Sequence, residues 1–152
     1  MNSISSILVT GGAGYVGSAL VNDLVKSGYK VRSLDAMFFD PNQEEEFFKN
    51  DSIEFVLGDI RDKQLVEKCL EGIECVIHLA AITGPLCDKS PNATKEINEY
   101  ATKEFVKLCK EKGIKRFFFA STCSNYGSNS SVVNEETPVN SLSLYSETKV
   151  EL

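Results

Sequence analysis

A glycine-rich segment follows the first apolar run of the chain, Ile7 to Thr10. Residues 11–17 read GGAGYVG, so Gly12, Gly14 and Gly17 form G-x-G-x-x-G, and Gly11 begins the wider G-x-x-G-x-x-G. Glycines let a strand turn sharply into a helix, let a pyrophosphate approach the backbone, and let the helix pack close to the sheet. A helix whose first residues are Tyr15 and Val16 would present free N–H groups and its positive dipole end to phosphates. The pattern predicts a dinucleotide-binding loop, and the alternative is a glycine-rich turn that binds nothing.

An acidic residue lies where such a loop requires one. Asp35 ends the second predicted strand, 18 residues after Gly17, and its carboxylate can accept hydrogen bonds from the adenosine ribose. The same charge would repel a 2′-phosphate, and Ala36 and Met37 supply no arginine to bind one. Arg32 is nearby, but it lies inside the strand and is interpreted as a surface residue. The predicted cofactor is therefore NAD rather than NADP.

Near the end of the sequence, Tyr145 and Lys149 are four residues apart. Residues with this spacing share one face of a helix, so the two side chains are expected to be neighbours. A phenol has a pKa of about 10, and an adjacent ammonium group favours its ionised form. Thr122, at the end of the fifth predicted strand, could hold a substrate oxygen while a proton moves. The alternative is a surface helix with an ordinary tyrosine and a solvated lysine; the dinucleotide loop upstream favours the catalytic interpretation.

The elements that would position these residues alternate between strands and helices. The strand candidates are almost continuously apolar, which is typical of a parallel sheet covered on both faces. Strands are predicted at 7–10, 30–34, 53–57, 75–79 and 116–121, and helices near 15–27, 42–50, 62–71 and 93–112. Repeated β-α-β units predict a doubly wound α/β fold of the Rossmann type, in which ligands bind beyond the carboxyl ends of the strands.

Composition narrows the possible partners and location. The net charge is −6, so the chain lacks the excess of basic residues that binds nucleic acid or anionic membranes. No segment has the length of a membrane span or the features of a signal peptide. The five cysteines form no C-x-x-C pair, so we expect reduced thiols in a cytoplasmic protein and no metal site. Cys75 and His78 are interpreted as buried strand residues rather than as metal ligands.

Four motifs together make the chain resemble the N-terminal part of an extended short-chain dehydrogenase/reductase of the NAD-dependent epimerase/dehydratase family. The resemblance runs over essentially the whole chain. Its motifs are TGGAGYVG at 10–17, GDIRD at 58–62, HLAA at 78–81, and the combination of Thr122 with Tyr145 and Lys149. The resemblance implies one NAD-binding domain over residues 1–152, truncated before a C-terminal substrate-binding region.

The resemblance also implies roles for individual residues. Tyr145 would be the general base, Lys149 would lower its pKa and bind the nicotinamide ribose, and Thr122 would hydrogen-bond the reacting oxygen. The remaining cofactor contacts would come from the glycine loop, from Asp59 and Ile60 at the adenine, from Leu79, Ala80 and Ala81 along the cofactor, and from Asn98 in the long fourth helix. The substrate would be a small molecule, a nucleotide sugar, with hydride exchanged at a sugar carbinol through a keto intermediate.

Two departures from the family pattern keep alternatives open. The 4,6-dehydratases carry Asp-Glu directly after the catalytic threonine, whereas this chain has Cys123 and Ser124, so dehydration is disfavoured relative to epimerisation. Ser121 precedes Thr122, and the choice between the two hydroxyls stays open, with Thr122 favoured. Because the resemblance stops where a substrate region would begin, the chain is either the cofactor half of an epimerase, dehydratase or reductase, or an NAD-binding module without turnover. A homodimer of the full-length form is expected from the resemblance.

Overall fold

The computed structural model describes residues 4–38 and 51–152. The predicted helix at 42–50 lies outside the described residues. The chain forms two compact units. The first comprises Met1–Ala80 and Glu104–Ala120, and the second comprises Ala81–Lys103 and Ser121–Leu152. Each unit is described separately below.

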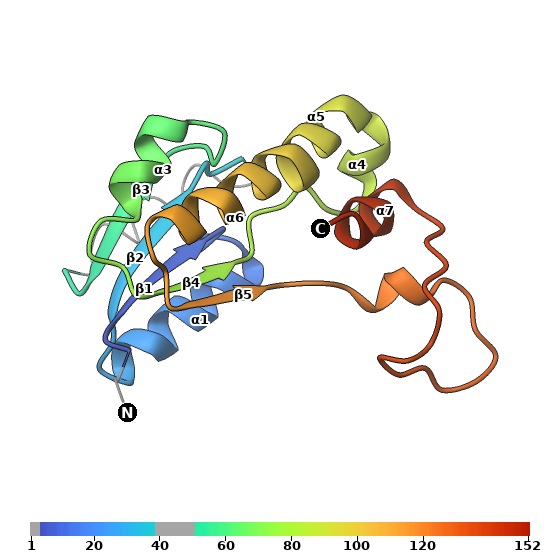
Figure 1. Ribbon diagram of the computed structural model, residues 1–152, viewed down its shortest axis with the longest axis horizontal. Helices are drawn as coiled ribbons and strands as arrows, with labels where there is room; N and C mark the ends of the chain where they lie inside the picture. The colour runs from blue at the N-terminus through green and yellow to red at the C-terminus, as the bar shows by residue number, and fades with distance from the viewer. Residues whose placement is uncertain (1–3, 39–50) are drawn as a thin grey trace. The chain divides into compact units, whose positions relative to one another are not determined.

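The first unit contains a parallel sheet of five strands, drawn as arrows in Figure 1. The strands are β1 (Ser6–Thr10), β2 (Lys30–Asp35), β3 (Ile53–Leu57), β4 (Cys75–His78) and β5 (Arg116–Phe119). Their order is β3-β2-β1-β4-β5, and every neighbouring pair is parallel. The order reverses between β1 and β4, which is where ligands of doubly wound sheets bind. The predicted fold class is confirmed, and all five strands lie within two residues of their predicted limits.

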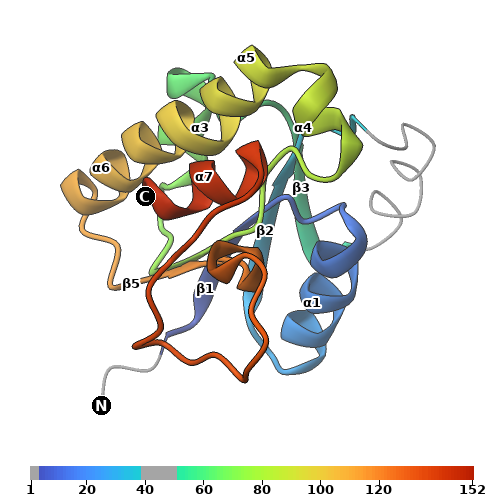
Figure 2. The ribbon, with the colours of Figure 1, turned by 90° about the vertical axis from the view of Figure 1, so that its right-hand side faces the viewer.

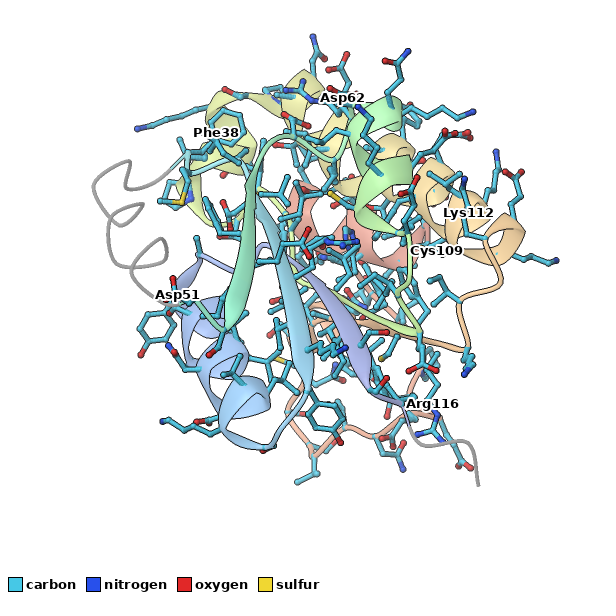
Figure 3. The ribbon with its side chains drawn as sticks, turned by 90° about the vertical axis from the view of Figure 1, so that its left-hand side faces the viewer. Phe38, Asp51, Asp62, Cys109, Lys112 and Arg116 are labelled. Atoms are coloured by element: carbon cyan, nitrogen blue, oxygen red, sulfur yellow. The ribbon has the colours of Figure 1, made fainter. Side chains whose placement is uncertain are left out.

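Helices cover both faces of this sheet. Helix α1 (Tyr15–Lys26) lies on one face, and α3 (Lys63–Cys69) lies on the other with the first-unit part of α6 (Thr102–Glu111) (Figures 1 and 3). Side chains alternate between the two faces, as the pleat of a strand requires. Ile7 and Val9 pack with Val21 of α1, whereas the ring of His78 lies 5.2 Å from that of Phe105 in α6.

The carboxyl ends of the strands lead into the segments that carry the predicted cofactor residues. Figure 3 shows Asp62 and Phe38 at this end of the sheet and Arg116 at the opposite end, where β5 begins. Asp62 caps α3, because its Oδ1 accepts a hydrogen bond from the Leu65 N–H at 3.1 Å. The cap fixes where the chain turns from the end of β3 into the helix.

Arg32 is not the surface residue that the sequence suggested. Its Nε lies 2.9 Å from Glu54 Oε1, and its side chain is only 17% exposed. Its Nη1 donates to the carbonyl oxygens of Cys69 at 2.7 Å and Glu71 at 3.0 Å, at the end of α3. Cations stabilise the carbonyls that a helix leaves unpaired at its C-terminus. Because β2 is an interior strand beside α3, the guanidinium is held in the fold.

Cys75 and His78 are buried strand residues, as predicted. The His78 ring lies between phenylalanines of β5 and α6, and its Nδ1 is 2.6 Å from Thr10 Oγ1. Among the residues described, no group of three or more His, Cys, Asp or Glu side chains could hold a metal ion.

The second unit is built from short helices. They are α4 (Pro85–Lys89), α5 (Pro91–Lys95), the π-helix η2 (Glu96–Ala101), the 3₁₀-helix η3 (Cys123–Tyr126) and α7 (Leu144–Val150). Helix α7 packs against α4, α5, η2 and η3 (Figure 2). The predicted helix 93–112 in fact begins at Pro91 and contains a π-helical stretch before α6, and α4 was missed. A π-helix adds a residue to one turn, which an apolar pattern averaged over the whole helix does not reveal.

Candidate active site

The glycine loop is held tightly at the reversal of strand order. The Gly11 N–H donates to Leu34 O at 2.8 Å, and Gly11 has φ +74°, which side chains rarely allow. A Cβ at Gly11 would lie 2.6 Å from Ala80 N, after β4, and a Cβ at Gly17 would collide with the backbone of Gly11 and Gly12. Close backbone packing therefore requires glycine at both positions. The loop and residues 79–80, predicted to share a site, are adjacent, since the Leu79 N–H donates to Thr10 O at 2.9 Å.

The start of α1 has the chemistry of an anion site. Gly14 is the N-cap and supplies no side-chain cap, the first turn has no acidic residue, and the first helical hydrogen bond runs from Ser18 N to Gly14 O at 2.9 Å. The N–H groups of Tyr15, Val16 and Gly17 precede that bond and have no partner within the helix. A Cβ at Gly14 would meet only Gly11 O, at 3.3 Å, so the space beside it is open. The loop therefore fits the pyrophosphate of a dinucleotide.

Asp35 lies at the end of β2 against this loop. Its Oδ2 accepts from the Ala13 N–H at 2.9 Å, and its Oδ1 accepts from the Met37 N–H at 2.8 Å. A carboxylate has about four acceptor positions, so it can bind ribose hydroxyls while it holds these two amides. The bond to Ala13 is a second role, bracing the loop, which the sequence did not reveal.

Asp59 follows β3, the neighbour of β2 in the sheet. The carboxyl end of β3 lies beside that of β2, because Gly58 N donates to Asp35 O at 2.8 Å. Arg61 binds the Asp59 carboxylate through Nε at 3.0 Å and Nη2 at 2.7 Å. These hydrogen bonds lower the pKa of Asp59. Ile60 is only 8% exposed and packs inside the first unit. The adenine contacts of Asp59 and Ile60 stay predictions.

Tyr145 and Lys149 share one face of α7 in the second unit, as their spacing predicts. The Lys149 Nζ lies 5.7 Å from the centroid of the Tyr145 ring. Ser143 and Ser146 form a capping box that starts the helix, with Ser143 Oγ accepting from Ser146 N at 3.2 Å. The pair is thus brought together on a helix with a defined beginning.

The protonation of this pair differs from the expectation that the ammonium group would stabilise a phenolate. Burial raises the pKa of Tyr145, and the negative charge of an ionised Cys87 would raise it further. Burial lowers the pKa of Lys149 to about 8, since this side chain is only 5% exposed. The Nζ lies over the face of the ring, where it interacts with the π-electrons. For both pKa values, the effect of burial is larger than the effect of this contact. In the chain alone, therefore, Tyr145 is a neutral phenol beside a lysine whose pKa is about 8.

Buried Lys149 predicts how stability depends on pH. Below about pH 8 the side chain is charged in both states, so the folded chain bears the full cost of burying the charge. As pH rises from about 8 to about 10.5 only the unfolded chain keeps the proton, so stability increases, by about 3 kcal/mol. Lys149→Met should remove this increase. Denaturant unfolding of both proteins at several pH values measures the difference, and parallel pH profiles would contradict it.

Thr122 and Ser121 come just before η3 in the second unit. Thr122 is the N-cap of η3, and its Oγ1 accepts from Ser124 N at 3.2 Å. Ser121 Oγ accepts from Asn125 Nδ2 at 3.1 Å, and both hydroxyls keep a proton to donate. Because η3 packs against α7, Thr122 belongs to the same unit as Tyr145. The choice of Thr122 over Ser121 as substrate ligand stays a prediction.

Asn98 is 1% exposed and lies in η2. Its Oδ1 accepts from the Ile82 N–H at 2.7 Å, and its Nδ2 donates to Ile82 O at 2.9 Å. These bonds fix the segment that follows Ala81. They give Asn98 a structural role that the sequence did not indicate, and its contact with a cofactor stays a prediction.

Comparison with known proteins decides the family. The family model described as "NAD dependent epimerase/dehydratase family" matches residues 7–152. The chain belongs to this family. The resemblance read from its motifs is thereby confirmed, and so is NAD as the cofactor, because this epimerase/dehydratase family is NAD-dependent. The described residues contain no helix that is long and apolar enough to cross a membrane.

Several known proteins are similar to this chain over nearly its whole length. The UDP-glucose 4-epimerase of Lactobacillus helveticus is 34% identical over 95% of this chain and 44% of its own length. The 3-beta-hydroxysteroid dehydrogenase of Mycolicibacterium neoaurum is 30% identical over 97% of this chain and 41% of its own. The structure of the UDP-glucuronic acid 4-epimerase of Bacillus cereus in complex with NAD is 34% identical, with a TM-score of 0.83 over 96% of this chain and 49% of that one. The chain thus spans less than half the length of these relatives.

Proposed function

We propose that this chain is the cofactor-binding part of an NAD-dependent nucleotide-sugar epimerase. The observation that carries the proposal is the pairing of Tyr145 with a buried Lys149, in a family member that also has an open glycine loop braced by Asp35. Epimerases of UDP-sugars are among the relatives of highest similarity, which supports a nucleotide sugar as the substrate.

The proposal assigns cofactor binding to residues of the first unit and proton transfer to residues of the second. The N–H groups at the start of α1 bind the pyrophosphate, and the Asp35 carboxylate binds the adenosine ribose. Bound NAD supplies the reversible acceptance of a hydride. The Tyr145 oxygen takes the proton from the sugar hydroxyl as the ketone forms and returns it afterwards, while Thr122 hydrogen-bonds the same sugar oxygen. Lys149 is charged below its pKa of about 8, and this positive charge stabilises the negative charge that develops on the Tyr145 oxygen.

The raised pKa of Tyr145 bears on when this step occurs. A neutral buried phenol gives up its proton only when nearby positive charge increases. The proposal therefore requires that NAD bind before Tyr145 is deprotonated, because the nicotinamide ring of the oxidised cofactor would supply a local positive charge. It follows that the pKa of Tyr145 should fall when NAD binds.

Two other functions have specific support. A binding module without turnover is supported by the open glycine loop and Asp35, which can hold NAD without the Tyr145–Lys149 pair. A dehydrogenase that releases NADH is favoured by the similarity to the steroid dehydrogenase. A dehydratase is disfavoured, since Cys123 and Ser124 stand where an acid and a base are needed.

One assay separates these functions. The intact protein that carries this chain is incubated with UDP-glucose and NAD, and products are followed by NMR together with the absorbance of NADH. The epimerase proposal expects UDP-galactose to form without net NADH. NADH in proportion to product would show a dehydrogenase, and NAD binding without any product from the common UDP-sugars would favour the binding module.

Asp35 should determine the choice of cofactor. Asp35→Ala removes the ribose acceptor and the bond to Ala13, so NAD affinity should fall by about tenfold or more, a typical effect for hydrogen bonds to charged groups. NADP affinity should fall less, because the carboxylate that repels its phosphate is gone. Calorimetric titration measures both. Asp23→Ala, at an exposed carboxylate on α1, is the control, and equal losses for the two cofactors would contradict the role of Asp35.

A further inference from the structure

A chain of buried hydrogen bonds runs through the second unit to the helix that carries Tyr145. Asn98 binds the backbone of Ile82 through both ends of its amide. The same Nδ2 donates to Thr148 Oγ1 at 3.4 Å, and Thr148 Oγ1 donates to Tyr145 O at 2.8 Å. Asn98 and Thr148 are each 1% exposed. The chain thus connects the segment after Ala81 to the last turn of α7.

The donors and acceptors in this network are matched. The Asn98 amide has two N–H groups, one for Ile82 and one for Thr148. The Thr148 hydroxyl accepts one bond and donates the other. A residue with no hydroxyl at position 148 would leave a buried N–H of Asn98 without its acceptor, which is costly.

The two ends of α7 are held in different ways. The first turn is fixed by the capping box of Ser143 and Ser146, whereas Lys149 lies in the last turn, beyond the reach of that box. A helix of seven residues is marginal without tertiary contacts. The Asn98–Thr148 bond ties the last turn of α7 to η2 through side chains.

We propose that Thr148 is a positioning residue, whose hydroxyl bridges Asn98 to α7 and so holds Lys149 Nζ over the Tyr145 ring. The inference rests on the proposed function only in taking Tyr145 and Lys149 as the catalytic pair. It assigns to Thr148 the orientation of that pair, with no contact of its own to substrate or cofactor.

The test measures the protonation of Lys149 in the chain itself. Lysine side-chain NMR, with the Lys149 signal assigned through Lys149→Met, follows the titration between about pH 6 and about pH 9. In this range Tyr145 and the nearby Cys87 stay neutral, because their pKa values are raised. The wild type should titrate at about 8. Thr148→Val keeps the shape of the side chain and removes the hydroxyl.

The expected result is a shift of the Lys149 pKa in Thr148→Val by about one unit or more toward 10.5, because a released lysine regains water. Thr148→Ala should give the same shift if the valine variant does not fold. Thr148→Ser keeps the hydroxyl and should titrate like the wild type.

Ser146→Ala is the matched control. It removes a buried hydroxyl from the same helix and lowers stability, but it does not touch the bond to Asn98, so the Lys149 pKa should stay near 8. The proposal is overturned if the valine and alanine variants keep the wild-type pKa, or if Ser146→Ala shifts it equally. The measurement needs neither substrate nor NAD, so it stands apart from failure of the proposed function.

Discussion

Tyr145→Phe should abolish measurable epimerisation by the intact protein and leave NAD affinity within about twofold of the wild type. A proton-transfer group typically contributes about 10²- to 10⁴-fold to the rate, and phenylalanine removes only the oxygen that carries the proton. The ring that Lys149 Nζ contacts is retained, so α7 should keep its packing. Turnover is measured by NMR of the sugar products, and NAD binding by calorimetry.

The matched control is Tyr100→Phe, at a tyrosine that is 56% exposed on η2. This variant should turn over at the wild-type rate. A loss of NAD affinity in Tyr145→Phe equal to its loss of turnover would contradict the role of general base, because it would show that the hydroxyl serves cofactor binding instead.

Gly17→Ala should destabilise the first unit and remove NAD binding. The added Cβ would collide with Gly11 O and lie 2.7 Å from Gly12 Cα, and neither backbone atom can move without opening the loop. Overpacking of this kind costs about 1–3 kcal/mol. Denaturant unfolding measures the loss of stability, and calorimetry measures the loss of NAD affinity.

Gly14→Ala separates the two effects. Gly14 has φ −72°, which alanine adopts easily, and the added Cβ meets only Gly11 O at 3.3 Å. Stability should therefore change by less than about 1 kcal/mol, the usual scale of a cap substitution. NAD affinity should still fall, because the methyl group would occupy the open space that a pyrophosphate needs. Wild-type NAD affinity in Gly14→Ala would show that this space is not the binding site.

Much of the fold was readable from the sequence because the central strands β1 and β4 are almost completely buried. Apolar runs such as those of β1 and β4 have few interpretations other than interior strands. Arg32 was misread, because a charged residue within a strand normally indicates exposure. Its partners, the carbonyls at the end of α3, are 36 to 39 residues away in the sequence and could not be anticipated.

The short helices of the second unit were harder to predict for a related reason. Pro85 and Pro91 are typical first residues of a helix, and they are the one local signal for α4 and for the start of α5. The π-helical turn at Glu96–Ala101 leaves no such signal. The long amphipathic pattern of this region therefore suggested a single regular helix.

The candidate site shows the same division between local and distant information. The spacing of Tyr145 and Lys149 predicted their contact, because four residues on a helix define a face. Their pKa directions were not predictable, since burial depends on packing far from both in sequence. The bond from Asp35 to Ala13 and the bridge from Asn98 to Thr148 likewise join residues 22 and 50 positions apart.

The central claim is that this chain binds NAD through its glycine loop and Asp35. The most direct test is calorimetric titration of the wild-type chain with NAD and, separately, with NADP. One molecule of NAD should bind per chain, with higher affinity than NADP, and Gly14→Ala should weaken that binding. No binding of NAD, tighter binding of NADP, or NAD binding unaffected by Gly14→Ala would contradict the account.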